Sequence, residues 1–371
     1  PNEMRAVLHQ DKVRVRITGQ DRKGRPEGHV LEIVERSVKQ LIGRLLQESG
    51  VWLLAPEDKR FGQDVLLPQG PGEGKSGQVV VVALTEAPAL YGQPVGKVIE
   101  VLGEVDDPGM EIEIAVRKYS VPHVFSADCL AAAEALPDKV MAKDRKGRVD
   151  LRDVPLVTID GEDARDFDDA VYCESAKIGR AKGWRLLVAI ADVSHYVQNG
   201  NAIDVDAYDR ATSVYFPRRV IPMLPEKLSN GLCSLNPKVD RLCLVCDMLI
   251  TADGDLHAYQ FYPAVMNSHA RLTYTEVAAI LSNTRGPEAA QRADLVPHLL
   301  DLHGVYSALL KAREARGAVD FDTVETKIVS DEAGRIEKIV PKQRTLAHRL
   351  IEEGKLADNL RAGNFILQNT R

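Results

Sequence analysis

The chain has 371 residues, and 44% of them are hydrophobic, which is enough for the cores of two or three domains. A formal net charge of −6 argues against nucleic-acid binding, because phosphate contacts normally need an excess of Lys and Arg, although acids gathered at a metal site are offset by the metal. No apolar run approaches the roughly 20 residues that cross a bilayer, and no leader opens the chain, so we expect no membrane association. The five cysteines do not fit a disulfide framework, and we expect the reducing cytoplasm.

The N-terminal residues predict a β-hairpin. Residues 12–17 alternate basic and apolar side chains, which indicates a half-buried strand with three positive charges on its outer face. A turn at residues 21–28 and a second strand at 30–34 complete the hairpin. The charged face is either a solvated edge or an RNA-facing surface, and the pattern leaves both open.

Five short apolar runs separated by turn residues follow, at residues 41–46, 51–55, 64–67, 78–84 and 96–102. Five strands without a helical period predict a small closed barrel of the OB or cold-shock type. Such barrels bind single strands by stacking bases on aromatic side chains. Only Trp52, Phe61 and Tyr91 are available here, so a passive channel wall is an equal alternative.

Residues 70–76 read Gly-Pro-Gly-Glu-Gly-Lys-Ser and resemble a phosphate-binding P-loop. That motif needs four residues between its first glycine and the Gly-Lys pair, whereas this chain has three, so we interpret the segment as a connector between barrel strands. Prolines, a short helical stretch at 126–136 and a charged run at 143–146 then indicate a linker.

A larger mixed domain begins near Val154. Its apolar patterns predict strands at residues 156–159, 184–193 and 240–250, and helices at residues 275–281, 300–315 and 346–367.

The most informative segment is residues 160–169, which hold six carboxylates and one arginine between two apolar runs. Carboxylates at such close quarters repel one another and raise one another's pKa values unless a cation offsets their charge, so an ordered cluster indicates a bound metal. Ligands that are all oxygen select hard ions, Mg²⁺ or Mn²⁺, over zinc.

Other interpretations of these residues fit less well. A solvated acidic turn rarely has an aromatic such as Phe167 inside it and strands at both ends. A calcium loop of the EF-hand kind lacks its glycine and distal glutamate, and an aspartyl phosphatase would place its first aspartate directly after an apolar strand. Cys243 and Cys246 suggest half a zinc site, but positions three apart in a strand face opposite ways, so we expect two core thiols.

The acidic segment and four later segments resemble the RNase II/RNase R (RNB) family of exoribonucleases, and bacterial RNase R most closely. The matching segments are residues 158–171 (TIDGEDARDFDDAV), 188–193 (VAIADV), 212–217 (TSVYFP), 221–225 (IPMLP) and 228–237 (LSNGLCSLNP). The chain departs from the family at residues 354–359 (GKLADN), where members usually continue with a more apolar run.

The resemblance implies a multidomain chain, in which an all-β OB/cold-shock barrel is followed by a truncated α+β RNB catalytic domain. We expect the end of a first cold-shock/OB domain at residues 1–36, a second barrel at 37–115, a linker at 116–150 and the N-terminal part of the catalytic domain at 151–371. Both ends of the chain look cut.

The resemblance also implies roles for individual residues. A pair of Mg²⁺ or Mn²⁺ ions would lie around the scissile phosphate, held by Asp160, Asp166, Asp168 and Asp169. Asp168 would organise the attacking water with support from Asp166, while Asp160 and Asp169 would be the principal ligands.

Further residues would contact RNA. Tyr215 would pack against the RNA 3′ end, Phe321 would clamp the terminal bases from the other side, and Tyr274 would contact RNA near the active site. Either Glu352 or Glu353 would sense the ribose. Core packing is the alternative for each aromatic, and a solvated helix position is the alternative for the glutamates.

The implied function is a monomeric, Mg²⁺-dependent 3′→5′ exoribonuclease that releases nucleoside 5′-monophosphates from single-stranded RNA. The alternative is an RNA-binding module without a complete catalytic half. The intact aspartates favour the enzyme, and the truncated end favours the binder.

Overall fold

The computed structural model describes residues 3–319, 325–331, 335–341 and 344–369. The chain divides into two compact units. One is formed by Pro1–His123 with Phe216–Arg218 and Val329–Lys338, and the other by Val124–Tyr215, Arg219–Ile328 and Ile339–Arg371.

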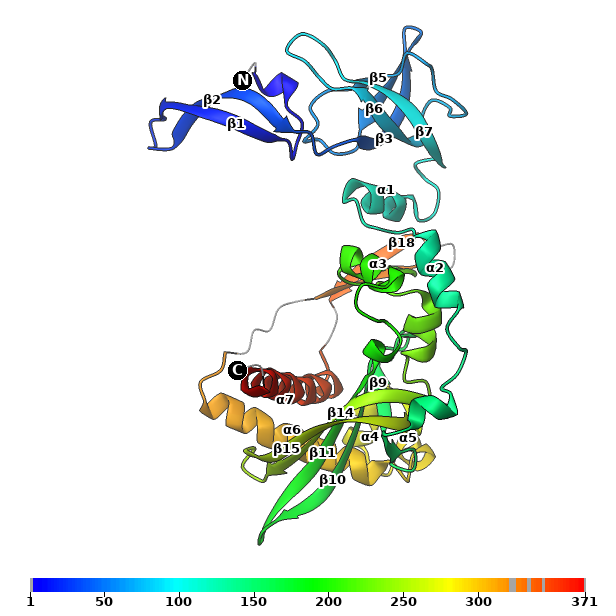
Figure 1. Cartoon of the computed structure of the whole chain (residues 1–371), viewed down its shortest axis with the longest axis vertical. Helices are drawn as coiled ribbons and strands as arrows, with labels where there is room; N and C mark the ends of the chain where they lie inside the picture. Colours follow the sequence, from blue (N-terminus) through cyan, green and yellow to red (C-terminus); the bar gives the residue numbers. More distant parts are fainter. Residues whose placement is uncertain (1–2, 320–324, 332–334, 342–343, 370–371) are drawn as a thin grey trace. The chain divides into compact units, whose positions relative to one another are not determined.

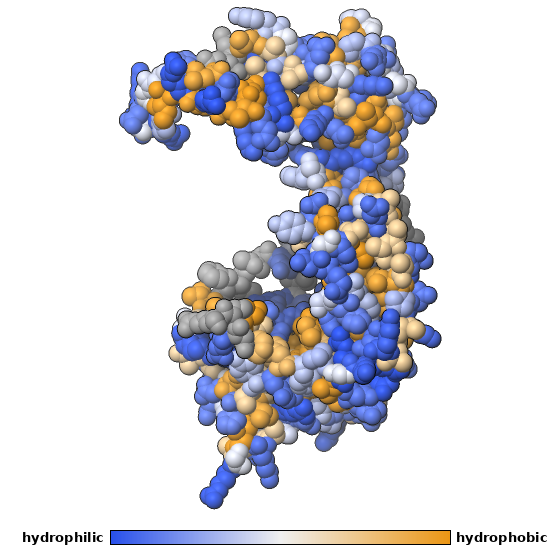
Figure 2. Space-filling model, viewed as in Figure 1, coloured by the Kyte–Doolittle hydropathy of each residue, from blue (hydrophilic) through white to orange (hydrophobic). Residues whose placement is uncertain are grey.

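The first unit opens with the 3-10 helix η1 (Glu3–Ala6) and an antiparallel hairpin of β1 (Lys12–Gln20) and β2 (Pro26–Glu35). The hairpin was predicted from its alternating pattern, but the expectation that it is half-buried is wrong. Val15 and Ile17 on β1 are 48% and 71% exposed. A two-stranded hairpin has no second layer of its own to bury an apolar face, and Figure 2 shows hydrophobic residues at the surface of this unit.

A closed barrel follows, with its strands in the order β3-β4-β5-β7-β6. The strands are β3 (Gln40–Glu48), β4 (Val51–Pro56), β5 (Val65–Leu66), β6 (Val79–Glu86) and β7 (Val95–Gly103). All five were predicted. Alternate side chains such as Leu45, Leu54 and Val80 fill the interior and are fully buried. Residues 70–76 connect β5 to β6 with no helix after them, which confirms that this segment is not a P-loop.

Helix α1 (Met110–Lys118) contacts β3 and β7 of the barrel. Met110 packs against Ile42 and Val79 of the barrel strands, and Val116 is also buried. This helix was not predicted, because its apolar residues alternate with charged ones and give no continuous apolar stripe.

The second unit is built on a seven-stranded sheet in the order β16-β9-β10-β11-β14-β15-β8. Its strands are β8 (Val149–Leu151), β9 (Val157–Asp160), β10 (Asp169–Ile178), β11 (Ala181–Ala191), β14 (Asp240–Thr251), β15 (Leu256–Asn267) and β16 (Ala270–Thr273). The four central strands form an antiparallel meander, whereas β8 and β16 pair in parallel at the edges.

Both faces of this sheet are buried. On β11, Leu187 and Ala189 belong to one core and Leu186 and Val188 to the other, as the period of two requires. A strand covered on both sides must be apolar at every position, which explains the continuous apolar run in the sequence.

Helices cover the two faces. One core contains residues of α4 (Tyr274–Ser282), α5 (Pro287–Gln291), α6 (Val296–Ala315) and α7 (Leu346–Asn369). Examples are Val277 of α4, Leu302 of α6 and Leu350 of α7. Figure 1 shows α6 and α7 beside each other on this face. Residues of α2 (Ala127–Glu134), α3 (Ala202–Arg210) and the π-helical turn η4 (Lys227–Leu232) enter the other core.

Short elements complete the chain. They are η2 (Ala142–Arg145), η3 (Val193–His195), the paired strands β12 (Val214–Phe216) and β13 (Arg219–Ile221), and the paired strands β17 (Thr326–Ser330) and β18 (Ile336–Pro341). Among the described helices, none combines the length and the hydropathy that a membrane crossing needs.

Candidate active site

The sheet topology brings the ends of the acidic segment together. Asp160 is the last residue of β9, and Asp169 is the first residue of its antiparallel neighbour β10. On the other side of β9, β16 pairs Thr273 with Asp160. Asp166 and Asp168 lie on the connecting loop, so all four aspartates gather at one end of β9 and β10.

The C-terminal half of this loop is fixed by hydrogen bonds to buried groups. Phe167 is 4% exposed in the core, and its N–H donates to the buried Ser234 Oγ at 3.0 Å. The Ser234 hydroxyl donates in turn to the Arg165 carbonyl at 3.0 Å. The Ala191 N–H donates to the Asp168 carbonyl at 2.9 Å. Phe167 is therefore the anchor that points inward while the flanking aspartates point to the site.

The N-terminal half of the loop is held by β16 and α4. The Arg271 guanidinium donates to the Glu162 carbonyl at 2.5 Å and to the Gly161 carbonyl at 3.3 Å, and it lies 5.2 Å from the Phe167 ring centre. The Thr275 hydroxyl donates to the Glu162 carboxylate at 2.6 Å. These contacts order the loop between Asp160 and Asp169, so it is not a solvated turn.

The aspartates perturb one another. Burial, followed by repulsion from Asp169, raises the pKa of Asp160 to about 6, and Asp166 and Asp168 add to the shift. Partial desolvation and the charges of Asp166 and Asp169 raise the pKa of Asp168. Burial is thus the larger cause of both shifts, and repulsion between neighbouring carboxylates adds to it.

A lysine from α7 offsets part of this charge. Lys355 Nζ lies 2.7 Å from Asp169 Oδ1, and the Asp169 side chain is only 6% exposed. The ammonium opposes the upward pKa shifts of both Asp160 and Asp168.

The donor set suits a hard divalent cation in its chemistry. All four groups are carboxylates, and the buried Asp160 Oδ2 has no hydrogen-bond partner among the residues that the structure describes. Within that same part of the chain, no three His, Cys, Asp or Glu side chains are drawn in closely enough to enclose an ion. The four carboxylates thus lie near one another, and Lys355 contacts Asp169.

Two of the predicted RNA-contacting aromatics lie at the site. The Tyr215 hydroxyl donates to Asp166 Oδ2 at 2.5 Å while its side chain is 62% exposed, and desolvation with this hydrogen bond raises its pKa to about 12. Tyr274 stacks on His348 of α7, with ring centres 3.9 Å apart. Burial and the charges of Asp160 and Asp169 raise the Tyr274 pKa. Phe321 lies outside the described residues.

The two candidate glutamates of α7 have different surroundings. Glu353 is buried and forms an ion pair with Arg313 of α6 at 2.9 Å, so it joins the two helices. Glu352 is 44% exposed, is hydrogen-bonded to Arg344, and contributes to the raised pKa of Tyr274. Glu352 is therefore the one of the pair that lies beside the aromatic edge of the site.

Comparison with protein families identifies the domain that carries the four aspartates. The RNB domain model matches residues 148–371, which is more than half of the chain. The chain belongs to the RNB family. A cold shock domain model matches residues 54–126 and a ribonuclease B OB domain model matches residues 1–33, both within the β-rich N-terminal part. The OB-type barrel followed by an RNB domain is thus confirmed as the fold class.

Curated relatives of this RNB chain are named ribonuclease R. The protein from Vibrio cholerae is 48% identical over 366 residues, which cover 98% of this chain and 44% of that protein. The Escherichia coli protein is 48% identical over 98% of this chain and 44% of its own length. The Acidithiobacillus ferrooxidans protein is 49% identical over 86% of this chain and 73% of its own. The chain therefore spans less than half the length of the first two relatives.

Solved structures agree with this assignment. RNase R from Mycoplasma genitalium in complex with ribose methylated single-stranded RNA has a TM-score of 0.90 and is 27% identical, covering 100% of this chain and 58% of that one. Yeast Ssd1, described as a pseudonuclease, shares the fold with a TM-score of 0.66 at 16% identity, over all of this chain and 46% of its own.

Reasoning from sequence missed several residues that shape the RNB site. Ser234 and Arg271 position the acidic loop, and Lys355 contacts Asp169, although all three are distant from that loop in sequence. The LSNGLCSLNP segment contains Ser234 and was singled out only by resemblance. The prediction for the cysteines is confirmed, because Cys243 and Cys246 are buried in the cores on opposite faces of the sheet.

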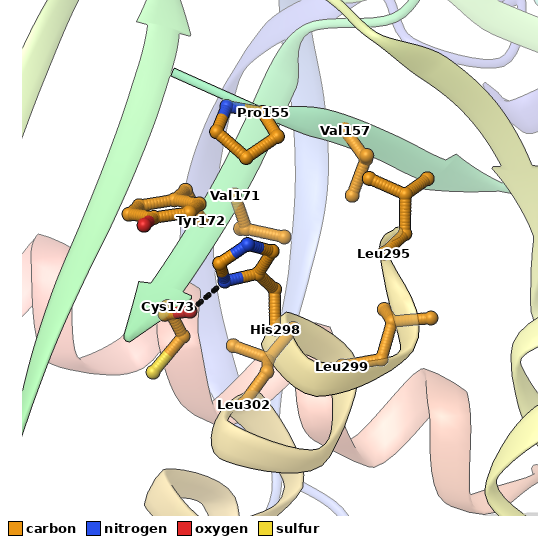
Figure 3. Close-up of a pocket in the computed structure, with 9 residues that line it drawn as sticks. All are labelled: Pro155, Val157, Val171, Tyr172, Cys173, Leu295, His298, Leu299 and Leu302. Atoms are coloured by element: carbon orange, nitrogen blue, oxygen red, sulfur yellow. Dashed lines mark hydrogen bonds between the residues drawn. The ribbon is translucent and has the colours of Figure 1, made fainter. Parts of the chain in front are cut away.

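A small cavity lies beside the strands that carry the aspartates. Figure 3 shows His298 between Tyr172 and the leucines of α6, with its Nδ1 3.0 Å from the Cys173 carbonyl. The cavity has a volume of about 10 Å³ and is lined mostly by apolar side chains. It has room for no more than a water molecule, so it is a packing defect of the core and not a ligand site.

Proposed function

We propose that this chain is the metal-dependent part of a 3′→5′ exoribonuclease that hydrolyses single-stranded RNA from its 3′ end. The observation that carries the proposal is the gathering of four aspartates at one end of β9 and β10, where the buried Asp160 Oδ2 has no hydrogen-bond partner within the described ranges. The names of the curated relatives support the reaction, and the RNA in the Mycoplasma genitalium complex supports the substrate.

In the proposed reaction, a bound ion and the aspartates of the chain have separate roles. A bound Mg²⁺ or Mn²⁺ would supply a Lewis acid and an activated water for attack on the terminal phosphodiester. Water adds to phosphorus, the bond to the 3′ oxygen of the preceding nucleotide breaks, and a nucleoside 5′-monophosphate leaves. Asp160 and Asp169 would be the principal ligands, and Asp168, the exposed member of the cluster, would orient the attacking water.

Aromatic side chains would place the RNA end. The exposed Tyr215 ring offers a face for the terminal base, while its hydroxyl holds Asp166 in position. Tyr274, fixed by its stack on His348, would contact the RNA near Asp160. Glu352 would accept a hydrogen bond from the ribose 2′-hydroxyl, which distinguishes RNA from DNA. Stacking ignores base identity and suits an enzyme that accepts any sequence.

The alternative is an RNA-binding module that does not hydrolyse its ligand. One observation favours it, because Lys355 already forms an ion pair with Asp169, one of the four carboxylates that would hold the ion.

One assay distinguishes the two functions. The chain is incubated with Mg²⁺ and 5′-labelled poly(A) RNA, and its Asp168→Asn and Asp163→Asn variants are compared with it. Asp163 is a matched control because it lies in the same loop with its side chain 93% exposed. We expect stepwise 3′ shortening by the chain and by the control, and a loss of at least about 100-fold in Asp168→Asn.

The products and the binding decide the outcome. Release of nucleoside 5′-monophosphates and sparing of DNA of the same sequence are expected of the nuclease. Equal gel shifts by all three proteins with no shortened RNA would instead support the binding module. Equal shortening by Asp168→Asn would contradict the role given to the aspartates.

A further inference from the structure

Lys355 lies where a cation of the active site is expected. It comes from α7, packed on one face of the sheet, and its Nζ contacts Asp169 Oδ1 at 2.7 Å. The Asp169 side chain is 6% exposed, whereas the Lys355 side chain is 43% exposed. An ion pair with one buried partner is stronger than a pair on the surface, because water screens it less.

The ammonium interacts with the cluster as a whole. Its positive charge is attracted most strongly to Asp169, and then to Asp160 and Asp168. Three of the four aspartates therefore act on the same ammonium.

Charge balance limits how many further cations the site can take. Four carboxylates carry −4 and Lys355 carries +1, so one divalent ion leaves a sum of −1 and two leave +1. Two-metal sites place their ions about 3.5–4 Å apart with carboxylates shared between them. A second ion at Asp169 would therefore meet the ammonium at close range and would have to displace it.

We propose that the Lys355 ammonium takes the place of one of the two metal ions expected at this site, so that the aspartates hold a single divalent cation. This inference rests on the proposed function, since it concerns the same four carboxylates. Asp160 Oδ2, buried and without a partner in the described part of the chain, would be a ligand of the ion that remains. Lysine suits the other position because its ammonium is a compact point charge on a flexible stem.

The test counts bound ions and does not depend on activity. The whole chain is titrated with Mn²⁺, and free Mn²⁺ is followed by its paramagnetic resonance signal. Lys355→Met and Lys355→Gln remove the charge, Lys355→Arg keeps it, and Lys311→Met removes a charge from the exposed surface of α6 as a control. Circular dichroism in EDTA verifies that each variant is folded. Two neutral variants are used so that the test can still be made if one of them does not fold.

We expect one tight Mn²⁺ in the wild type, in Lys355→Arg and in Lys311→Met. In the neutral variants a second ion should bind at least about 10-fold more tightly than any second ion in the wild type. Two tight ions in the wild type, or an equal count and affinity in the neutral variants, would overturn the inference while leaving the proposed function intact. No bound ion in any of the proteins would overturn both.

Discussion

Replacing Ser234 with alanine tests whether one hydroxyl holds the acidic loop in place. Ser234 is fully buried, accepts a hydrogen bond from the Phe167 N–H and donates one to the Arg165 carbonyl. Alanine leaves both backbone groups without this partner, the Phe167 N–H in the core and the Arg165 carbonyl in a partly buried position, and a buried group left unpaired costs about 1–3 kcal/mol. The carbonyl has a second lone pair and relaxes more easily, so we expect a total loss of about 2–4 kcal/mol in the free energy of unfolding of the RNB unit.

Tryptophan fluorescence can report this unit alone. The chain has two tryptophans, and Trp184 lies on β11 of the large sheet, whereas Trp52 lies in the barrel. Urea unfolding is therefore followed by Trp184 fluorescence in a Trp52→Phe background. The dependence of the free energy of unfolding on urea concentration is compared between parent and variant before the midpoints are converted to free energies. Ser307→Ala is the control, because Ser307 is exposed on α6, and its loss should change stability by less than about 0.5 kcal/mol. If Ser234→Ala were as harmless as this control, the loop would not depend on the hydroxyl.

Two further substitutions test the fold around the site. Gly254→Ala should lower the free energy of unfolding by more than about 2 kcal/mol in the same Trp184 assay, because Gly254 has φ +82° and a new Cβ would lie 2.2 Å from the Ala308 carbonyl oxygen of α6. Gly179→Ala is the control, because Gly179 has φ +62° in open space, and it should lower stability by only about 1–2 kcal/mol. An equal loss in the two variants would refute the clash. In the barrel, the hydrogen bond from Arg60 lowers the pKa of Asp58 from 3.8 to about 2, so its ionised form adds stability above pH 3.8 that is lost as the pH falls toward 2. Unfolding followed through Trp52 in a Trp184→Phe background should therefore show a steeper loss over that window in the parent than in Asp58→Asn, and parallel curves would contradict the shift.

The sequence predicts most of the strands because their signals are local. Each barrel strand is an apolar run bounded by turn residues, and β11 and β14 contain the apolar runs 186–191 and 242–246, which are typical of a sheet covered on both faces. The acidic segment is equally local, and its ends at Asp160 and Asp169 coincide with the ends of β9 and β10.

The remaining features depend on packing between distant segments. Lys355 reaches Asp169 across 186 positions, and nothing near either residue in the sequence points to the other. Glu352 and Glu353 are adjacent, so the sequence cannot tell which one faces the site. Their directions differ by about 100° around the helix, and the rotation of α7 is set by contacts with distant segments, among them the ion pair of Glu353 with Arg313 on α6 and the stack of His348 on Tyr274.

The surroundings of the four aspartates explain why spacing alone could not divide their roles. Asp166 accepts a hydrogen bond from the Tyr215 hydroxyl, and the buried Asp169 forms an ion pair with Lys355. The Asp168 residue is exposed, and its carbonyl accepts a hydrogen bond from the Ala191 N–H. Asp160 alone among the four combines a buried oxygen that has no hydrogen-bond partner within the described residues with a pKa that burial, and then repulsion from Asp169, raises to about 6. A divalent cation would stabilise most the carboxylate whose charged form is disfavoured in this way. The fold therefore favours Asp160 as the centre of the proposed metal site, and it does so through contacts from β12, β11 and α7 that lie far from the acidic segment in sequence.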